Sequence, residues 1–258
     1  MLPKKVYYKM LNNLFPPHSY KLYDEILSKA KANSYNILTL KQFWQLPDTP
    51  PSPFLILRHD IDSDAAAALL FAEIERKHNY PATYFFRRIT WNDRIVNTIS
   101  RQGHELGYHY EEMTDFAKAR HLKTKAEVLP HVPEIQQIFA HNLLVLRQKS
   151  GLELSSMAAH GDFAWKILDL GNRIILKDEV FRAQQGICYE AYDEELVARY
   201  GIHISDKPYP ESFYPHHPLE LTEQKTSFLL LTHPRWWHPN PIGNFASDLR
   251  VNLQKVLW

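Results

Sequence analysis

The hydrophobic and polar residues of the chain alternate repeatedly between a strand-like and a helix-like pattern from residue 54 onward. FLILR (54–58) is apolar without a break up to its arginine, which is typical of a strand buried on both faces. Apolar residues at helical spacing then include Leu69 and Ile74. ATYFF (82–86) and ELGYH (105–109) predict the next two strands, with another helix between them.

These first three strands are centred about 25 residues apart, the length of a strand plus a helix, which predicts parallel strands with right-handed crossovers. A last apolar pattern, from Phe245 to Val256, predicts a helix that closes the chain. The fold prediction is an α/β protein, a distorted (β/α) barrel of about seven strands, with an open doubly wound sheet as the alternative. Later strand candidates are SSMAA (155–159), GICYE (186–190), GIHIS (201–205) and SFLLLTH (227–233).

The first 46 residues have a helical pattern of their own. We expect them to form an N-terminal helical extension (1–46) that packs on the barrel (47–258). The residues at helical spacing are Leu22, Tyr23, Ile26, Leu27 and Ala30.

Composition narrows the function classes. With 30 basic and 29 acidic side chains, the chain has no overall positive field that would attract nucleic acid or anionic lipid. Its one cysteine, Cys188, cannot form an internal disulfide. The N-terminus lacks the pattern of a signal peptide, and no apolar run reaches the ~20 residues that a membrane span needs. We therefore expect a soluble, cytoplasmic protein that binds no nucleic acid.

Charged residues and histidines recur where the predicted strands end, as in RHDID, YHYEE, AAHGD, HISDK and LTHPRWW. The carboxyl ends of barrel strands are where catalytic residues gather. Strand alternation puts Asp60 and Asp62 on one face and His59 on the other. Two carboxylates on one face repel unless they share a cation or a proton, which suggests a metal ligand beside a catalytic base. His104 and His109 are five residues apart, so only one should face the site, and His109 lies nearer the strand end.

Four segments in order resemble the motifs of the polysaccharide deacetylases (NodB homology, carbohydrate esterase family 4). The resemblance spans residues 54–237 and is closest to the divergent branch whose first motif is histidine, aspartate, aliphatic, aspartate. It implies a NodB-like distorted barrel and the metal-dependent removal of an N-acetyl group from an acetamido sugar of a polysaccharide or its precursor. The segments are LRHDID (57–62), TYFFR (83–87), GHELGYH (103–109) and LLLTHP (229–234).

The resemblance also implies roles for individual residues. Asp60 matches the catalytic base, His109 a ligand of a divalent metal, commonly zinc, and His233 the general acid. The family's adjacent aspartates are here separated by Ile61, so assigning Asp62 as the carboxylate ligand assumes a shift of one residue.

The family's second histidine ligand is missing from its usual position. Met113 stands there, and a thioether is a poor ligand for such an ion. The third ligand must then come from elsewhere, with His160 in MAAHGDF the first candidate and Glu111 the second. Asp206 could orient His233. Three further residues are expected to contact substrate, namely Arg87, Trp236 and Trp237.

Several alternatives stay open at this stage. The aspartates and His109 could form a buried ion-pair cluster with Arg58 or Arg87. Met113 motivates a second hypothesis, a barrel that binds no metal and serves as a carbohydrate-binding or assembly protein. A third hypothesis is a hydrolase of a non-sugar C–N bond, such as a cyclic amide or ureide. The sequence does not reveal the oligomeric state.

Overall fold

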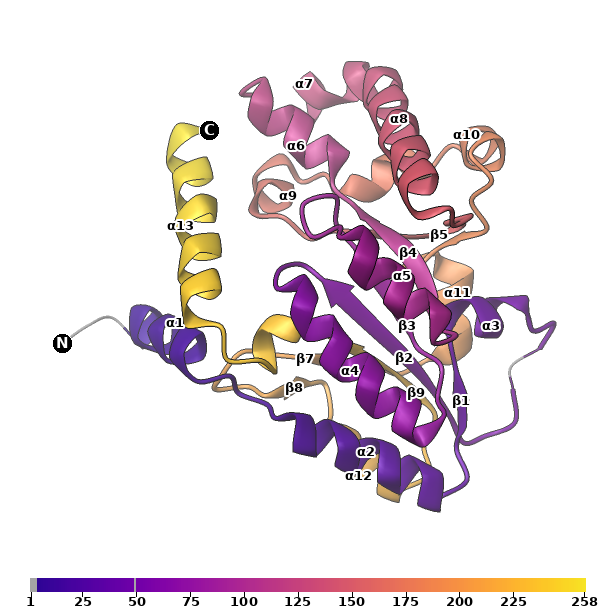
Figure 1. Ribbon diagram of the computed structural model, residues 1–258. Coiled ribbons are helices and arrows are strands. Elements are labelled where there is room, and N and C mark those ends of the chain that lie inside the picture. The colour runs from indigo at the N-terminus through magenta and orange to yellow at the C-terminus, as the bar shows by residue number, and fades with distance from the viewer. Residues whose placement is uncertain (1–3, 49) are drawn as a thin grey trace.

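The computed structural model describes residues 4–48 and 50–258 as a single sheet surrounded by helices (Figure 1). Its nine strands have the order β6-β5-β4-β3-β2-β9-β7-β8, with β1 paired to β2 off this path. All pairs are parallel except β7 with β8. The strands are β1 (Asn36–Leu38), β2 (Phe54–Ile61), β3 (Thr83–Phe86), β4 (Glu105–Tyr110), β5 (Ser156–Ala159), β6 (Tyr189–Glu190), β7 (His203–Asp206), β8 (Phe213–Tyr214) and β9 (Phe228–Thr232).

The parallel strands follow one another around a ring that is open on one side. From β2 to β6 each strand pairs with its predecessor in the chain, and β9 closes the other side between β2 and β7. No ladder joins β6 to β7 in the described part of the chain. The order does not reverse midway, as it would in a doubly wound sheet. The predicted distorted (β/α) barrel is therefore confirmed, and its distortion is this opening between β6 and β7.

Side chains rather than backbone hydrogen bonds bridge the opening. β6 has only two residues and so offers little edge for pairing. Tyr192, just after β6, stacks on His203 of β7, with their ring centroids 6.5 Å apart. Tyr200 meets the same histidine edge-on, and the Arg58 guanidinium donates to the Tyr192 hydroxyl from inside the barrel.

Strand alternation divides the side chains of β2 between the barrel interior and the layer under the helices. Leu55, Leu57 and Ile61 belong to the large apolar cluster that the surrounding helices cover. Phe54 and Ile56 belong to a separate cluster inside the barrel. Asp60 has the same parity as this second pair, so the alternation directs its side chain inward.

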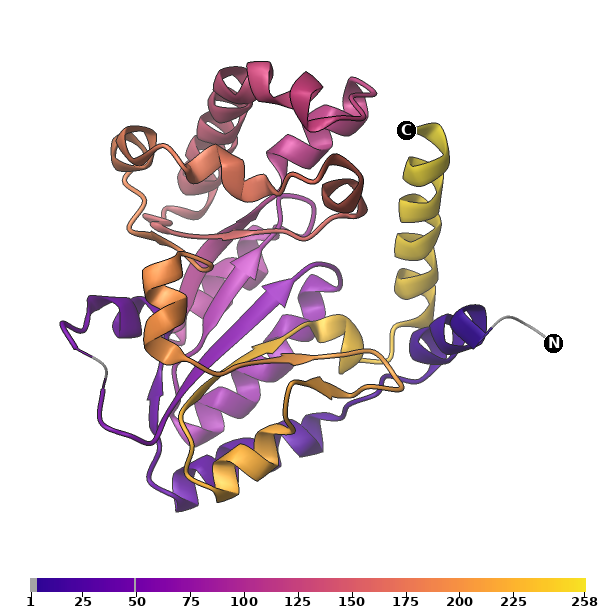
Figure 2. The same cartoon turned by 180° about the vertical axis from the view of Figure 1, so that it is seen from behind.

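Most of the helices lie outside the ring of strands, as both views show (Figure 2). Within the described residues, no helix has both the length and the apolar character that a membrane crossing requires. The helices after β2 are α4 (Ala65–His78), α5 (Asp93–Arg101), α6 (Glu112–Ala119), α7 (Lys125–Val128), α8 (Val132–Ser150), α9 (Phe163–Leu168), α10 (Glu179–Gln184), α11 (Glu194–Tyr200), α12 (Pro218–Glu223) and α13 (Pro241–Leu257), with 3-10 turns η1 (Leu129–His131), η2 (Asn172–Leu176) and η3 (Pro234–Trp236).

The N-terminal segment contains α1 (Lys4–Leu14), α2 (Tyr20–Ala32), β1 and α3 (Leu40–Gln45). The Ser19 side chain caps α2, whose buried residues are Tyr23, Ile26, Leu27 and Ala30. β1, which the sequence pattern did not predict, extends the sheet beside the start of β2. Leu40 and Phe43 of α3 close the bottom of the barrel interior.

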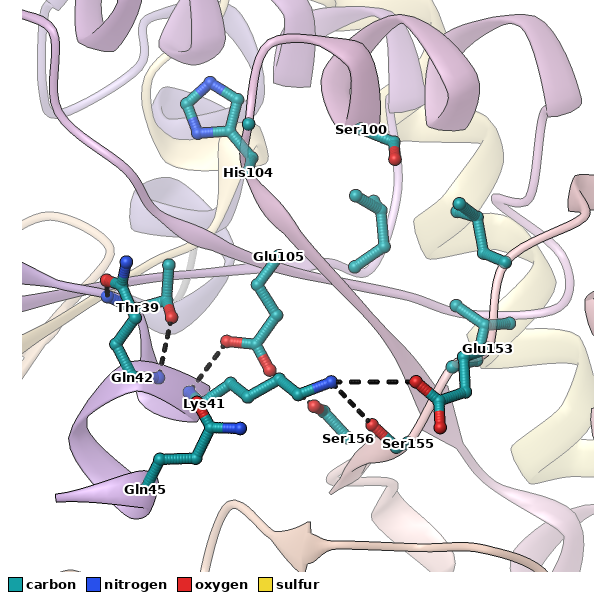
Figure 3. A pocket seen from close by; sticks show the side chains of 14 residues that line it. Thr39, Lys41, Gln42, Gln45, Ser100, His104, Glu105, Glu153, Ser155 and Ser156 are labelled. Atoms are coloured by element: carbon teal, nitrogen blue, oxygen red, sulfur yellow. Dashed lines mark hydrogen bonds and ion pairs between the residues drawn. The ribbon is translucent and has the colours of Figure 1, made fainter.

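A polar pocket of about 260 Å³ lies at the amino ends of the strands, beside α3 (Figure 3). The Lys41 amide donates to Glu105, and its ammonium group donates to Ser155 and lies 4.0 Å from Glu153. Glu105 also accepts from Tyr189 and two hydroxyls of neighbouring strands. The charged groups of Lys41 and Glu105 are thus held by hydrogen bonds within the pocket, at the end of the barrel that in such folds serves stability rather than catalysis.

We expect Gly107→Ala to lower the free energy of unfolding by about 3 kcal/mol, because overpacking a close-packed interior forces its neighbours apart. A Cβ atom at Gly107 would lie 2.7 Å from the carbonyl oxygen of Ser156 and also collide with the Phe85 ring. Urea denaturation measures the effect. The control is Gly161→Ala, where a Cβ atom meets nothing within 4 Å. Equal stability of the two variants would contradict the prediction.

Candidate active site

The carboxyl ends of five strands bring six of the predicted site residues to one end of the barrel. They come from β2, β4, the residue after β5, β7 and the residue after β9. Contacts of 3.5 Å or less link the first four of them, and the last two form a pair with each other. The residues are Asp60, Asp62, His109, His160, Asp206 and His233.

Asp62, His109 and His160 form a group with the composition and spacing of a metal site. One ligand atom from each lies within 4.8 Å of the others. The Asp62 Oδ1 atom is 3.1 Å from His109 Nε2 and 3.5 Å from His160 Nε2. Two imidazoles and a carboxylate are a ligand set that catalytic zinc uses, with a fourth position left for water or substrate.

The hydrogen bonds of this group fit a bound cation. His109 Nδ1 lies 2.9 Å from the Ala158 carbonyl oxygen. A nitrogen facing a carbonyl must carry the proton, so in the neutral ring Nε2 presents its lone pair toward Asp62. The Asp62 Oδ1 atom is buried, and its neighbours are these His109 and His160 nitrogens. A divalent metal between the three atoms would satisfy the carboxylate oxygen and both lone pairs.

Of the two candidates for the third ligand, His160 lies in the group and Glu111 lies behind it. Glu111 Oε2 is 3.2 Å from His160 Nδ1, on the opposite side of the ring from Asp62. Arg87 Nε donates to Glu111 at 3.0 Å. Burial alone would raise the pKa of Glu111, but His160 and Arg87 together hold it below its ordinary value. A carboxylate behind a ligating histidine is the usual means of orienting its ring.

Asp162 and Glu111 could also bind a metal, but basic side chains already bind both of them. Glu111, His160 and Asp162 form a second group of suitable spacing, but Asp162 accepts from Lys118 at 2.9 Å and Glu111 is held by Arg87.

Met113 lies on α6 and is completely buried in the apolar layer. The residue at the family's usual second histidine position thus belongs to the core.

Asp60 is bound at both oxygens by Arg58, at 2.9 and 2.8 Å. Both side chains are buried, and the guanidinium lies over the rings of Tyr192 and Phe85. Burial would raise the pKa of Asp60, but the Arg58 charge outweighs it and lowers the pKa. The sequence analysis predicted no role for Arg58 beyond a possible ion pair with the aspartates. Arg58 lies two residues before Asp60 on the same strand, and this spacing indicates that the two side chains share a face.

His233 and Asp206 form a second pair on the rim. His233 Nδ1 lies 2.6 Å from Asp206 Oδ1, and the His233 amide donates to the other oxygen at 2.7 Å. Burial alone would lower the pKa of His233, but Asp206 and the more distant Asp62 and Asp60 raise it to about 9. His233 is therefore held as a protonated imidazolium at neutral pH, with Nε2 free to donate.

The three residues expected to contact substrate are placed differently from one another. Trp237 is 1% exposed and donates its indole N–H to Asp206, so it supports His233 from inside and forms no substrate wall. Arg87 lines the cavity, but its guanidinium is bound to Glu111 and to the Asp62 carbonyl. Trp236 lines the cavity beside His233.

A cavity of about 220 Å³ opens above this group. Its floor is lined by Asp62, His160 and His233. Beneath this floor lie two buried residues, Asp60 and His109. One wall comes from α13, through residues that include Arg250 and Gln254. The sequence pattern predicted this helix but not its position over the site.

The His233 pKa predicts a pH dependence of stability. A histidine whose folded pKa is about 9, against an ordinary 6.5, stabilises the fold fully below pH 6.5 and loses this contribution as the pH rises through 9. The difference in unfolding free energy between the natural protein and His233→Gln should therefore shrink over that window. Urea denaturation at a series of pH values measures it, with the exposed His141→Gln on α8 as the control. A constant difference would contradict the prediction.

Comparison with known proteins finds similarity among solved structures alone. No family model matches the chain, and no curated protein sequence does. BA3943, described as a CE4 family pseudoenzyme from Bacillus anthracis, is 13% identical, with a TM-score of 0.42 over 80% of this chain and 62% of that one. A BA3943 mutant with restored enzymatic activity is covered over 64% of its length. The chain thus spans less than two thirds of these two proteins.

Two other matches are covered more fully. A family 4 carbohydrate esterase from Bacillus anthracis is 13% identical, with a TM-score of 0.40 over 91% of this chain and 86% of that one. The peptidoglycan deacetylase PdaC from Bacillus subtilis is 12% identical, with a TM-score of 0.37 over 80% of this chain and 95% of that one. The matched structures thus include proteins named as an esterase or a deacetylase and one named as a pseudoenzyme.

Proposed function

We propose that this protein is a metal-dependent hydrolase that removes an N-acetyl group from an acetamido sugar. One observation carries the proposal: Asp62, His109 and His160 converge with the spacing of a metal site, beside the carboxylate Asp60 and the imidazolium His233. Amide hydrolysis needs a Lewis acid, a base for water and an acid for the leaving nitrogen, and this arrangement supplies all three.

Each residue has one task in this proposal. Asp62, His109 and His160 would hold a divalent metal, whose chemistry at such a site is to polarise a carbonyl and to acidify water. Asp60 accepts the proton of the water that attacks the amide carbon. His233 donates its Nε2 proton to the nitrogen as the C–N bond breaks, giving acetate and the free amine. Asp206 holds the His233 ring and keeps it protonated.

The proposal is tested by metal content and turnover together. We expect about one zinc or comparable ion per chain in protein purified without chelator, and none in His109→Ala. Elemental mass spectrometry gives the content, and acetate release from N-acetylglucosamine oligomers and nucleotide-linked N-acetyl sugars gives the activity. The exposed His141→Ala is the control and should keep both. Metal-free natural protein, even after incubation with zinc, would overturn the proposal.

The hydrogen bonds from Arg58 to Asp60 favour a second candidate function. Both of its oxygens are bound by Arg58 and the side chain is almost completely buried, so it has no free oxygen directed at the cavity. A barrel that binds an N-acetylated sugar without hydrolysing it is consistent with this geometry. Sugar binding by calorimetry without acetate release from metal-loaded protein would support this candidate over the first.

A further inference from the structure

Helix α13 has its hydrophobic and polar faces reversed relative to a helix that packs on a protein core. Its outward residues are apolar and between 42% and 86% exposed: Ile242, Phe245, Leu249, Leu253 and Val256. Its inward residues are mostly polar: Asn244, Ser247, Asp248, Val251 and Gln254. A surface helix normally buries its apolar stripe. Here the stripe is continuous along the helix and no described residue covers it.

Helix α1 extends this apolar area at the base of α13. The two helices are joined by Asn13, which donates to Asp248 at 2.7 Å, and Arg235 donates to the same carboxylate at 2.8 Å. Figures 1 and 2 show both helices at the edge of the molecule, away from the sheet. The exposed apolar residues of α1 and the turn after it are Tyr7, Met10, Leu14 and Phe15. We name these four residues, with the five outward residues of α13, the α1–α13 surface.

The charges that the structure describes beside the α1–α13 surface are positive. They are the exposed Lys4 at the start of α1 and the exposed Arg250 on α13. The sequence of α1 contains no acid, and the one acid of α13, Asp248, is turned inward to Arg235. The chain as a whole has a net charge of only +1, so this is a local concentration of basic residues. A second copy of the same surface would meet like charges, whereas anionic lipid headgroups would meet opposite ones.

We propose that the α1–α13 surface docks on an anionic lipid bilayer, with α13 lying in the interface. An apolar stripe with aromatic residues, flanked by arginine and lysine, is the composition that holds a helix at the headgroup boundary without crossing the membrane. The opposite face of α13 lines the candidate cavity. Docking therefore holds the cavity about one helix diameter, ~10 Å, from the membrane surface. If the site hydrolyses N-acetyl groups as proposed above, this position favours a sugar carried on a lipid.

Vesicle sedimentation with the full chain tests the docking independently of any activity. We expect binding to vesicles of phosphatidylcholine mixed with phosphatidylglycerol, and much weaker binding to phosphatidylcholine alone. Leu249→Glu with Leu253→Glu should weaken partitioning roughly a hundredfold, since each leucine loses most of its burial free energy. Val180→Glu changes an equally exposed apolar residue on α10 and is the matched control. Circular dichroism verifies that both variants are folded.

Three results would overturn the docking. One is no binding to either vesicle type, and another is binding that the leucine substitutions leave unchanged. The third is a lipid-free dimer, measured by light scattering, that Leu249→Glu with Leu253→Glu converts to a monomer, because a second copy would then cover the surface. The two proposals can fail separately. Acetate release without vesicle binding would contradict the docking alone, and vesicle binding without acetate release would contradict the proposed function alone.

Discussion

Asp60→Asn should lower kcat/KM for N-acetyl hydrolysis roughly a thousandfold, within the range of general-base contributions. Asparagine has nearly the same shape, and its one oxygen can still accept a hydrogen bond from Arg58, so the metal group should persist. The buried Arg58 charge loses its partner, so the free energy of unfolding should fall, and circular dichroism must show that the variant is folded under the assay conditions. What disappears is the carboxylate that accepts a proton from water. Turnover measured beside metal content separates this loss from a loss of the metal.

Asp62→Asn is the matched comparison for Asp60→Asn. It changes the carboxylate whose Oδ1 atom lies between His109 and His160. We expect it to lose both metal and turnover, while Asp60→Asn loses turnover alone. If Asp60→Asn retained turnover close to that of the natural protein, Asp60 would be a structural partner of Arg58 and the base would have to be another group.

Glu75→Ala should lower the free energy of unfolding by about 3–5 kcal/mol, the cost of removing one partner from a buried ionic network. Glu75 is completely buried on α4 and accepts from the hydroxyls of Tyr23 and Tyr84, each at 2.5 Å. His59 Nε2 lies 2.6 Å from the same carboxylate. Alanine would leave these groups without a partner and open a cavity between α2, α4 and the sheet.

Urea denaturation measures this effect, and Glu73→Ala on the same helix is the control. The Glu73 side chain is 43% exposed and pairs with Arg76 three residues away, so its loss should change stability by less than about 1 kcal/mol. Similar values for the two variants would mean that water replaces the Glu75 carboxylate in the network.

The strands were predictable because buried parallel strands have a simple pattern. FLILR at 54–58 and the later apolar runs overlap seven of the strands that the structure describes, and alternation alone put Asp60 and Asp62 on one face. The strands that the pattern missed, β1 and β8, have three and two residues. Segments this short give no periodicity, and long-range pairing with β2 and β7 is what makes them strands.

Parts of the site could not be predicted, because they depend on which elements become neighbours. The spacing of histidines along the chain could not distinguish His160 from Glu111, since the decision lies in Arg87 reaching Glu111 from β3. Trp237 looked like a substrate wall from its place in the chain, yet the adjacent Asp206 draws its indole inward. For α13 the pattern gave the apolar stripe but not its direction, because periodicity does not say which face meets the protein.

The opening between β6 and β7 is the part of the barrel that can widen without the loss of backbone hydrogen bonds between strands. Elsewhere around the ring, widening would break rows of backbone hydrogen bonds, but between β6 and β7 it would separate aromatic side chains, such as the stacked rings of Tyr192 and His203. Arg58 reaches from β2 to Tyr192 at this opening and holds Asp60 with the same guanidinium. Arg58 and Asp60 lie on the same strand, so widening would take Tyr192 away from Arg58 while the Arg58–Asp60 ion pair moves as one unit.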